Sequence, residues 1–521
     1  MEKREKRARP VAMLAVAAGI AAFWGVLAIT DPPGPGLDPD AMSYLGAGMT
    51  FAHDGTFRVP APVWTSADTT MPLAHFPPGF PAAIAAGIVV GMTPVNAARL
   101  VEATAGGVMV AAVLSVAAAA GGVFAALIAA AMLFTTTALI ISHASVLSEP
   151  LFLALLALFI LQMRREAPEE RSTRSMLVLG VIAAATVLVR YAGASLAAAL
   201  VLDALFAARR APWSERLRRV AIAGVVPAAA LGAWAMSRPK TGGTKIRQAG
   251  LYVAGLGDNV LDAIDTLAHW LAPGVGPRAV QLGVALAVLV ALAVLVARTA
   301  IAAQAATRQR GEGQPESRMY RAVALTAASY AAVVGASRLL ADPGIPFDER
   351  MFAPLFVLAI MAVAPALAHW WRRARPAASL LSAVVAALWL VRVAHVAADT
   401  VREYRADGGD LASREWRLSP LVDYARTADA GTRLYSNWPS AIWFHTRRSV
   451  TESPTALDAR TVAAFRAKIG REHGALLAFA SRSPNVAPPD SLARLAGLVR
   501  VLSGAGGTVW RSPADSAKLQ P

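Results

Sequence analysis

Long apolar segments alternate with short polar segments along the first three quarters of the chain. The first apolar segment covers Val11 to Thr30. Runs of roughly 18 or more apolar residues are long enough to cross a bilayer as a helix. By the hydropathy criterion we expect about eleven crossings. The stretch Ala82 to Met92 is apolar but too short to cross, and it is expected to dip into the outer leaflet. The pattern predicts a mainly α-helical, polytopic membrane protein.

The later crossings and their connections can be assigned along the chain. A turn is expected at Gly121 and Gly122, a longer polar loop at Ser237–Arg278, and a hydrophilic linker at Arg298–Arg321. The later crossings are assigned to 96–119, 123–141, 149–163, 176–189, 192–208, 221–236, 280–297, 322–340, 351–368 and 379–395.

The charge pattern gives the orientation. The chain has a formal charge of +16 and 56% hydrophobic residues. Its basic residues form short clusters between apolar runs, as the positive-inside rule requires, and no basic soluble face is evident, which excludes nucleic acid as a partner. The N-terminus is therefore predicted to be cytoplasmic, with the first span uncleaved. The loop 31–81 is then extracytoplasmic. The absence of cysteine excludes disulfides and thiolate metal sites.

The composition changes to a soluble pattern near Ala397. Short strands are predicted around Thr432–Ser436, Ser449–Thr451 and Gly474–Ala480, and a final hairpin turns about Gly504–Gly507. We therefore divide the chain into a transmembrane domain (1–396) with a catalytic first outer loop, and a small extracytoplasmic α/β domain (397–521).

Ionisable residues at the ends of spans suggest where chemistry takes place, because such residues in a membrane protein are functional by default. Under this topology the outer face collects Asp38, Asp40, His75, Glu149, Arg190, Lys240, Lys245, Arg247, Asp348, Glu349 and Arg350. They come from span ends far apart in the sequence, as an active site built between helices requires.

Each acidic candidate also has a structural interpretation. Asp40 fits a catalytic base beside the bilayer, or the N-cap of a helix that begins at Ala41. Asp38 forms with Asp40 a spaced pair that could hold Mg²⁺ or Mn²⁺, or else a solvated turn beside Pro39. Glu149 needs a partner or a wet cavity, unless it only lies in the first turn of a helix capped by Ser148.

The basic candidates are suited to a departing phosphate. Arg190 and Arg350 lie at outer span ends where positive charge is otherwise scarce, and developing negative charge needs cationic donors. Lys240 and Lys245 offer the same chemistry from a glycine-containing loop, where a solvated surface is the alternative. For Arg350 the alternative is a salt bridge to one of its two acidic neighbours. His75 could bind an acceptor, ligate a metal or shuttle a proton, or simply lie at the interface.

Four motifs together resemble the GT-C glycosyltransferases. They are Asp40-x-x-x-Tyr44 after the first span, Pro77-Pro78-Gly79-Phe80-Pro81, Ser148-Glu149-Pro150-Leu151-Phe152 and Val189-Arg190-Tyr191. The resemblance covers roughly the first 200 residues and is strongest to protein O-mannosyltransferases, lipid A aminoarabinose transferases and lipopolysaccharide-core galacturonosyltransferases. It implies a sugar donor on a polyprenyl phosphate, with Asp40 at the position of the base and Tyr44 in the substrate site. His75-Phe76 departs from the acidic–basic pair that several relatives carry there.

The favoured hypothesis is an inverting glycosyltransferase of the cell inner membrane. It would move a sugar from a polyprenyl-phosphate donor to an envelope lipid, glycan or protein, with Asp40 and Glu149 catalytic. A transporter or lipid flippase is the alternative. It predicts inverted repeats and charges near the middle of the membrane, and neither is evident. A non-catalytic assembly protein that presents the C-terminal domain leaves the polar first loop unexplained.

Overall fold

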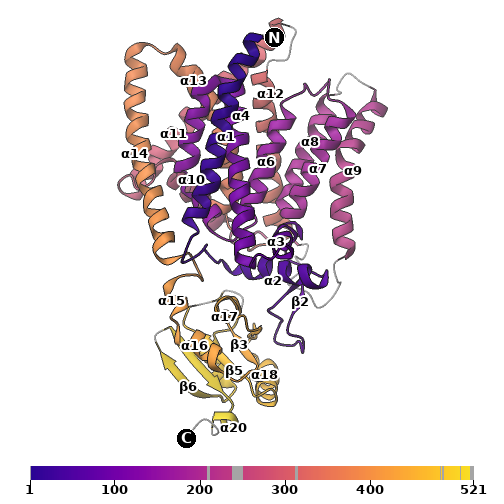
Figure 1. Ribbon diagram of the computed structural model, residues 1–521, viewed down its shortest axis with the longest axis vertical. Coiled ribbons are helices and arrows are strands. Elements are labelled where there is room, and N and C mark those ends of the chain that lie inside the picture. Colours follow the sequence, from indigo (N-terminus) through magenta and orange to yellow (C-terminus); the bar gives the residue numbers. More distant parts are fainter. Residues whose placement is uncertain are drawn as a thin grey trace.

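The protein is described by a computed structural model that covers residues 2–207, 212–237, 250–310, 315–481, 483, 486–504 and 506–516. A bundle of long helices forms one end of the molecule, and a small α/β domain forms the other (Figure 1). Between them lies a layer of short helices and loops from the first polar segment. The predicted fold class, a helical bundle followed by a small α/β domain, is confirmed.

Seven of the described helices are long and apolar enough to cross a membrane, so this is a membrane protein. The shorter apolar helices α6, α7 and α8 run in the same bundle (Figure 1). The bundle comprises α1 (Glu2–Ile29), α4 (Pro94–Thr135), α5 (Thr137–Ala144), α6 (Glu149–Met163), α7 (Thr173–Val189), α8 (Ala194–Ala207), α9 (Trp213–Ser237), α11 (Arg278–Arg310), α12 (Pro315–Leu340), α13 (Glu349–Arg373) and α14 (Pro376–Asp407).

The helix α4 has two legs that meet at Gly122. This glycine has φ 78° and ψ −174°, a conformation that residues with a side chain rarely adopt. The carbonyl of Gly121 accepts a hydrogen bond from Arg372 at the end of α13, whereas Thr135 lines a recess with Glu349 at the start of α13. The chain therefore reverses at Gly122, as the sequence predicted. With two legs in α4, the bundle has a helix for each predicted crossing.

Three connections differ from the sequence prediction. The linker expected at 298–321 is helical on both sides, because α11 continues to Arg310 and α12 begins at Pro315. The loop expected at 237–278 contains an amphipathic helix, α10 (Leu256–Leu271). Arg338 of α12 pins this helix by donating to Asn259 Oδ1 at 2.6 Å. The last span α14 continues to Asp407, beyond the boundary expected near 397. For α11, α12 and α14, helix formers carry the helix past the apolar segment that hydropathy detects, whereas α10 is a separate amphipathic helix within the loop.

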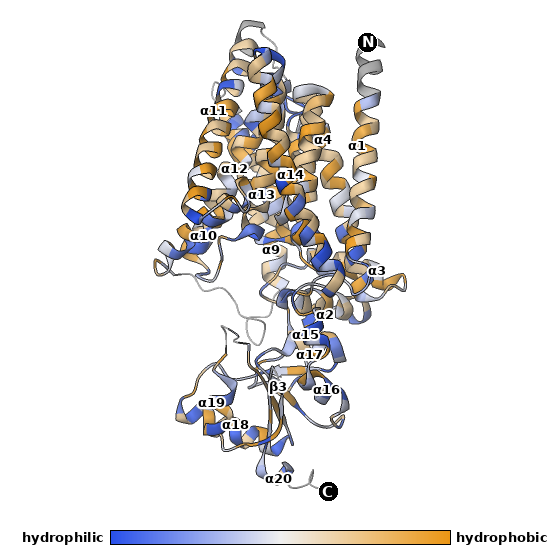
Figure 2. Ribbon diagram, turned by 90° about the vertical axis from the view of Figure 1, so that its left-hand side faces the viewer, coloured by the Kyte–Doolittle hydropathy of each residue, from blue (hydrophilic) through white to orange (hydrophobic). Residues whose placement is uncertain are grey.

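The first polar segment forms a layer at the end of the bundle that faces the small α/β domain. It contains α2 (Pro39–Asp54), the strands β1 (Arg58–Val59) and β2 (Met71–Pro72), and α3 (Gly79–Val89). The short helix α3 lies beside α2 at the end of the bundle, as expected for a segment that does not cross (Figure 1). Figure 2 shows the change from the apolar bundle to the polar layer below it.

The C-terminal domain is built on a five-stranded sheet in the order β4-β3-β5-β7-β6. The strands β3 (Leu434–Ser436), β4 (Val450–Glu452) and β5 (Ala475–Phe479) are parallel, and β6 (Val499–Gly504) and β7 (Gly507–Arg511) form an antiparallel hairpin. All of them were predicted. Helices cover the sheet: α15 (Arg414–Arg417), α16 (Pro420–Thr427), α17 (Pro439–Thr446), α18 (Ala459–Arg471), α19 (Pro489–Leu495) and α20 (Pro513–Ser516).

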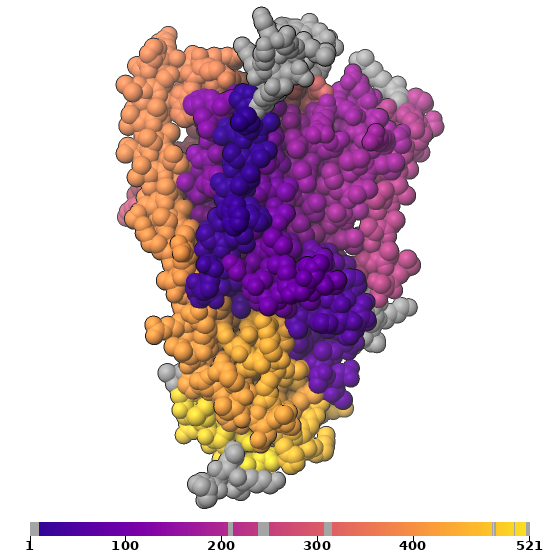
Figure 3. All heavy atoms as spheres, in the orientation of Figure 1, coloured from indigo at the N-terminus to yellow at the C-terminus, as the bar shows by residue number. Residues whose placement is uncertain are grey.

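One apolar cluster joins this domain to the first polar layer. Tyr44, Leu45 and Phe80 from the layer pack in the same cluster as Trp443 and Phe444 of α17. The loop between β1 and β2 adds polar contacts, since the carbonyls of Ala67 and Asp68 accept hydrogen bonds from Arg433 and that of Ser66 accepts one from Lys468. The two parts form a continuous surface in Figure 3. The C-terminal domain therefore packs against the layer formed by the first polar segment and is not merely connected to the bundle by the chain.

The arrangement predicts that residues 68 and 214 lie on opposite sides of the membrane. Asp68 is exposed in the first outer loop, and Ser214 is exposed at the start of α9, where Arg219 contacts the α6–α7 connection. Because the chain has no cysteine, Asp68→Cys and Ser214→Cys each give a single labelling site. A membrane-impermeant maleimide applied to right-side-out vesicles should label only the first variant. Labelling of Ser214→Cys alone would contradict the predicted orientation.

Candidate active site

Arg350, in the first turn of α13, lies at the centre of the candidate site. Its three guanidinium nitrogens donate to three carboxylates: Nε to Glu149 at 2.8 Å, Nη1 to Asp38 at 3.0 Å and Nη2 to Asp40 at 3.2 Å. Its expected alternative partners, Asp348 and Glu349, are not bonded to it; Asp348 instead caps α13 by accepting from the Met351 N–H. The guanidinium holds its donors in a fixed plane, which lets it donate to three carboxylates from three sides.

The two aspartates begin helix α2. Asp38 is the N-cap, and its carboxylate accepts the Asp40 N–H at 3.0 Å. Asp40 lies in the first turn, so its expected alternative role as the N-cap belongs to Asp38 instead. Pro39 between them occupies the first helical position, where the missing N–H is not needed. This local geometry turns both carboxylates toward Arg350.

Glu149 is the buried member of the site, with 2% of its side chain exposed. Its Oε1 accepts a hydrogen bond from Arg350 Nε at 2.8 Å and forms an ion pair with Arg190 Nη1, also at 2.8 Å. Its Oε2 has no hydrogen-bond partner among the described residues. Ser148 does not cap α6; its hydroxyl accepts from Arg190 Nη1 at 3.1 Å and lies 3.3 Å from the Tyr44 hydroxyl. Glu149 therefore has the partners that its apolar setting requires.

A large cavity opens beside this cluster, with about 2000 Å³ of empty space that is partly open to solvent. Asp40, Tyr44, Arg190 and Arg350 line it, as does His75, whose ring packs edge-on against Phe76 with centroids 4.6 Å apart. Tyr44 is only 1% exposed, and it packs edge-on against Phe80. Sequence candidates from α2, the first outer loop, the α7–α8 turn and α13 thus meet at one cavity.

The setting changes the ionisation of the aspartates. Desolvation raises the pKa of Asp40 above the ordinary value of 3.8, although Arg350 acts in the opposite direction. Desolvation and the neighbouring Asp40 likewise raise the pKa of Asp38. The side chain of Asp40 remains 34% exposed, toward the cavity. It is therefore an accessible carboxyl that binds a proton more readily than an ordinary aspartate.

The two aspartates were also predicted as ligands of Mg²⁺ or Mn²⁺. Arg350 donates to both carboxylates, so its positive charge occupies the place where a divalent cation would bind. Among the described residues, no group of three or more histidines and carboxylates could hold a metal ion. Asp38 and Asp40 therefore do not fit a metal site in this arrangement.

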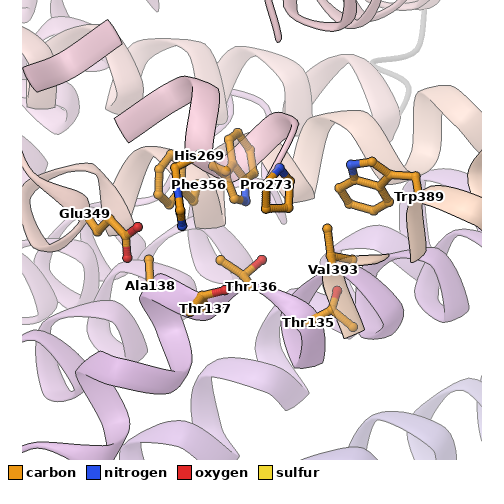
Figure 4. Close-up of a pocket in the computed structure, with 11 residues that line it drawn as sticks. Thr135, Thr136, Thr137, Ala138, His269, Pro273, Glu349, Phe356, Trp389 and Val393 are labelled. Atoms are coloured by element: carbon orange, nitrogen blue, oxygen red, sulfur yellow. The ribbon is translucent and has the colours of Figure 1, made fainter. Parts of the chain in front are cut away.

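Two other sets of predicted residues lie apart from the cluster. Lys240 and Lys245, with Arg247, fall outside the described residues. Glu349 points away from Arg350 into a separate recess with about 350 Å³ of empty space, partly open to its surroundings. Figure 4 shows Glu349 near His269 and Phe356, with Thr136 and Trp389 farther along the recess. The start of α13 thus divides this recess from the large cavity.

Glu102 of α4 supports the site and was not identified from the sequence. It is fully buried, and its Oε1 accepts the Leu147 N–H at 3.1 Å. Leu147 belongs to the α5–α6 link, which ends in Ser148 and Glu149. A carboxylate inside an apolar span is the same signal that marked Glu149, so the rule for ionisable residues in membrane segments would have found it.

Comparisons with known proteins give a likeness of fold. No family model matches the sequence, and no curated protein matches it. The structure of ArnT from Cupriavidus metallidurans in the apo state is 14% identical with a TM-score of 0.47, covering 98% of this chain and 99% of that one. The same protein bound to undecaprenyl phosphate is 13% identical with a TM-score of 0.46, covering 96% and 97%. The Archaeoglobus fulgidus oligosaccharyltransferase tethered with an acceptor peptide is 12% identical with a TM-score of 0.48, covering 96% and 74%. At these TM-scores the likeness is one of overall layout alone.

The role of Glu102 predicts different outcomes for two substitutions. Glu102→Leu leaves the buried Leu147 N–H without an acceptor, which costs about 1–3 kcal/mol, and should lower the thermal unfolding midpoint by a few degrees. Glu102→Gln keeps the acceptor oxygen and should stay near the wild-type midpoint. Thermal unfolding of the full chain in detergent distinguishes them. Equal midpoints for the two variants would contradict a hydrogen-bonding role for this carboxylate.

Proposed function

We propose that this protein is an inverting glycosyltransferase. In this proposal it transfers a sugar from a polyprenyl-phosphate donor to a lipid, glycan or protein acceptor at the extracytoplasmic face of the inner membrane. The observation that carries the proposal is the meeting of Asp40, Arg190 and Arg350 at one cavity, with the buried Glu149 paired to both arginines behind them. The sequence selected all four by their span-end positions, and Asp40, Glu149 and Arg190 also lie in the GT-C-like motifs.

The acids suit the acceptor half of the reaction. The acceptor hydroxyl gives its proton to the Asp40 carboxylate while its oxygen attacks the anomeric carbon on the face opposite the phosphate. The bond from the anomeric carbon to the phosphate oxygen breaks, and its electron pair leaves with the polyprenyl phosphate. Configuration at the anomeric carbon is inverted. If the acceptor is already an anion, Asp40 orients it and takes no proton.

Arg190 and Arg350 are suited to bind the phosphate group of the sugar donor. Arg190 is 16% exposed and lines the cavity, where its guanidinium can face a phosphate oxygen. Arg350 lines the same cavity as Asp40 and donates to all three acids. A donor phosphate competes with Asp40 for Arg350, and any weakening of that pair leaves Asp40 a better proton acceptor. Glu149 Oε1 lies 2.8 Å from Arg190 Nη1 and 2.8 Å from Arg350 Nε, so it holds the two arginines close together.

The base assignment predicts a large loss of activity in Asp40→Asn. Removing a general base costs about 10²–10⁴-fold in rate, so turnover should fall at least about 100-fold while the fold is retained. The assay supplies purified protein in nanodiscs with undecaprenyl phosphate carrying aminoarabinose, mannose or galacturonic acid and with envelope acceptors. Release of undecaprenyl phosphate is measured by mass spectrometry. Asp68→Asn, an exposed acid in the same loop, is the matched control. Undiminished turnover in a folded Asp40→Asn variant would remove the assignment.

The pH dependence follows from the same carboxyl. The base acts only when ionised, and desolvation raises the pKa of Asp40 above 3.8. As pH falls, Asp40 therefore takes up its proton earlier than an ordinary aspartate would. The acid limb of kcat/KM should lie above pH 3.8 and should be absent from the residual activity of Asp40→Asn. An acid limb unchanged in that variant would show that another group controls it.

A further inference from the structure

Three segments that are far apart in the sequence share a short backbone ladder beside the active site. The Gly36 N–H donates to the Ala144 carbonyl at 2.8 Å, and the Val146 N–H donates to the Gly36 carbonyl at 2.9 Å. On the other side, the Leu37 N–H donates to the Gly409 carbonyl at 3.2 Å, and the Leu411 N–H donates to the Leu37 carbonyl at 3.1 Å. The loop that leads to Asp38 is therefore held between the α5–α6 link and the first residues of the C-terminal domain.

Close packing locks this ladder in place. Tyr404, near the end of α14, has its hydroxyl 3.1 Å from Ser145 Oγ. A Cβ atom added at Gly409 would lie 2.6 Å from Tyr404 Cε1, which is closer than real Cβ contacts. It would also lie 3.1 Å from the Cα of Gly36, which is tighter than most such contacts. A Cβ at Gly36 would lie 2.5 Å from Ser145 Oγ. The two glycines are needed here because the three segments approach so closely.

The ladder ends directly at the catalytic acids. Leu37 is followed by Asp38, the cap of α2, and the segment 144–146 is followed after Leu147 by Ser148 and Glu149. The third segment contributes Asp410, which has φ 52° and whose charge acts on both Asp38 and Arg350. The spacing between the aspartates and Glu149 thus depends on backbone bonds that the C-terminal segment helps to form.

We propose that Tyr404 and residues 409–411 are positioning residues of the active site, so that docking of the C-terminal domain sets the geometry of the catalytic acids. The domain then acts as part of the catalytic unit. The effect that we expect on turnover rests on the proposed glycosyltransferase function, whereas the effect that we expect on the hydrogen bonds of the ladder does not. An acceptor or partner that shifts this domain would change the alignment of Asp38 and Asp40 with Glu149.

The test compares two glycine substitutions in the full chain. Gly409→Ala places a methyl group against Tyr404 and Gly36. Gly431→Ala is the matched control, because a Cβ there meets nothing within 4 Å and neither glycine has a left-handed φ. Tyr404→Phe is a milder third variant that keeps the ring and removes only the hydroxyl bonded to Ser145. Hydrogen–deuterium exchange measured by mass spectrometry reports on the ladder, and the transfer assay reports kcat and KM.

We expect Gly409→Ala to speed amide exchange in peptides that cover residues 36–38 and 144–147, with kcat lowered by about 100-fold, as misplacement of reacting groups by about 1 Å can do. The donor KM should change little, because Gly409 does not line the cavity. Tyr404→Phe should give the same pattern at smaller amplitude, and Gly431→Ala should match the wild type.

Two results would overturn the inference. One is wild-type exchange in the ladder peptides of both Gly409→Ala and Tyr404→Phe. The other is faster exchange there with unchanged kcat. If Gly409→Ala fails to fold, Tyr404→Phe carries the same comparison. A wild-type protein without transferase activity would refute the proposed function, and the exchange measurement would still decide whether the C-terminal segment holds the ladder.

Discussion

The structure depends on one arginine that serves three acids. Asp38, Asp40 and Glu149 come from two segments more than 100 residues apart, and Arg350 comes from a third segment about 200 residues further on. Without a cation between them the carboxylates would repel one another, and Glu149, at 2% exposure, would be a buried charge. Removing one partner of such a buried ion pair costs about 3–5 kcal/mol. Because Arg350 belongs to α13 and binds all three acids, the packing of α13 against the layer that carries Asp38 and Asp40 also aligns the acids.

The α5–α6 link distributes this constraint through the molecule. Each of the five consecutive residues from Ser145 to Glu149 bonds to at least one distant part of the chain. Together they connect the active site to α2, α4, α7, α13, α14 and the first loop. The bonds are Ser145 to Tyr404, the Val146 N–H to Gly36, the Leu147 N–H to Glu102, Ser148 to Tyr44 and Arg190, and Glu149 to Arg190 and Arg350. A segment this short, with so many bonds to distant elements, can move only if several elements move with it.

The parts of this arrangement that depend on local sequence could be predicted. Apolar runs located the helices, and short segments bounded by turns and helices located the strands of the small domain. Span-end charge selected Asp40, Glu149, Arg190 and Arg350. What the sequence could not supply was the pairing, because Arg350 lies 310 residues from Asp40 and its acidic neighbours in the chain offered simpler partners. The sequence analysis offered Asp40 as the N-cap of α2, whereas the structure has Asp38, two residues earlier. The position was ambiguous because a proline can either precede a helix or occupy its first position, as Pro39 does. Helix α10 was missed because hydropathy does not detect a helix that carries only one apolar face.

The balance of charge in the site limits how a phosphate donor can bind. When all are ionised, three carboxylates face two arginines, so the cluster carries a formal charge of −1, and Asp410 adds another negative charge nearby. An anionic phosphate entering the cavity is therefore opposed unless a carboxyl takes up a proton. The raised pKa values of Asp38 and Asp40 make these two the groups that do so at least cost. By linkage, a phosphate that raises those pKa values further must itself bind more tightly as pH falls. Under the proposed function the same proton removes the base, so donor affinity and base strength would change in opposite directions with pH, and Arg350 would be the residue through which the two are coupled.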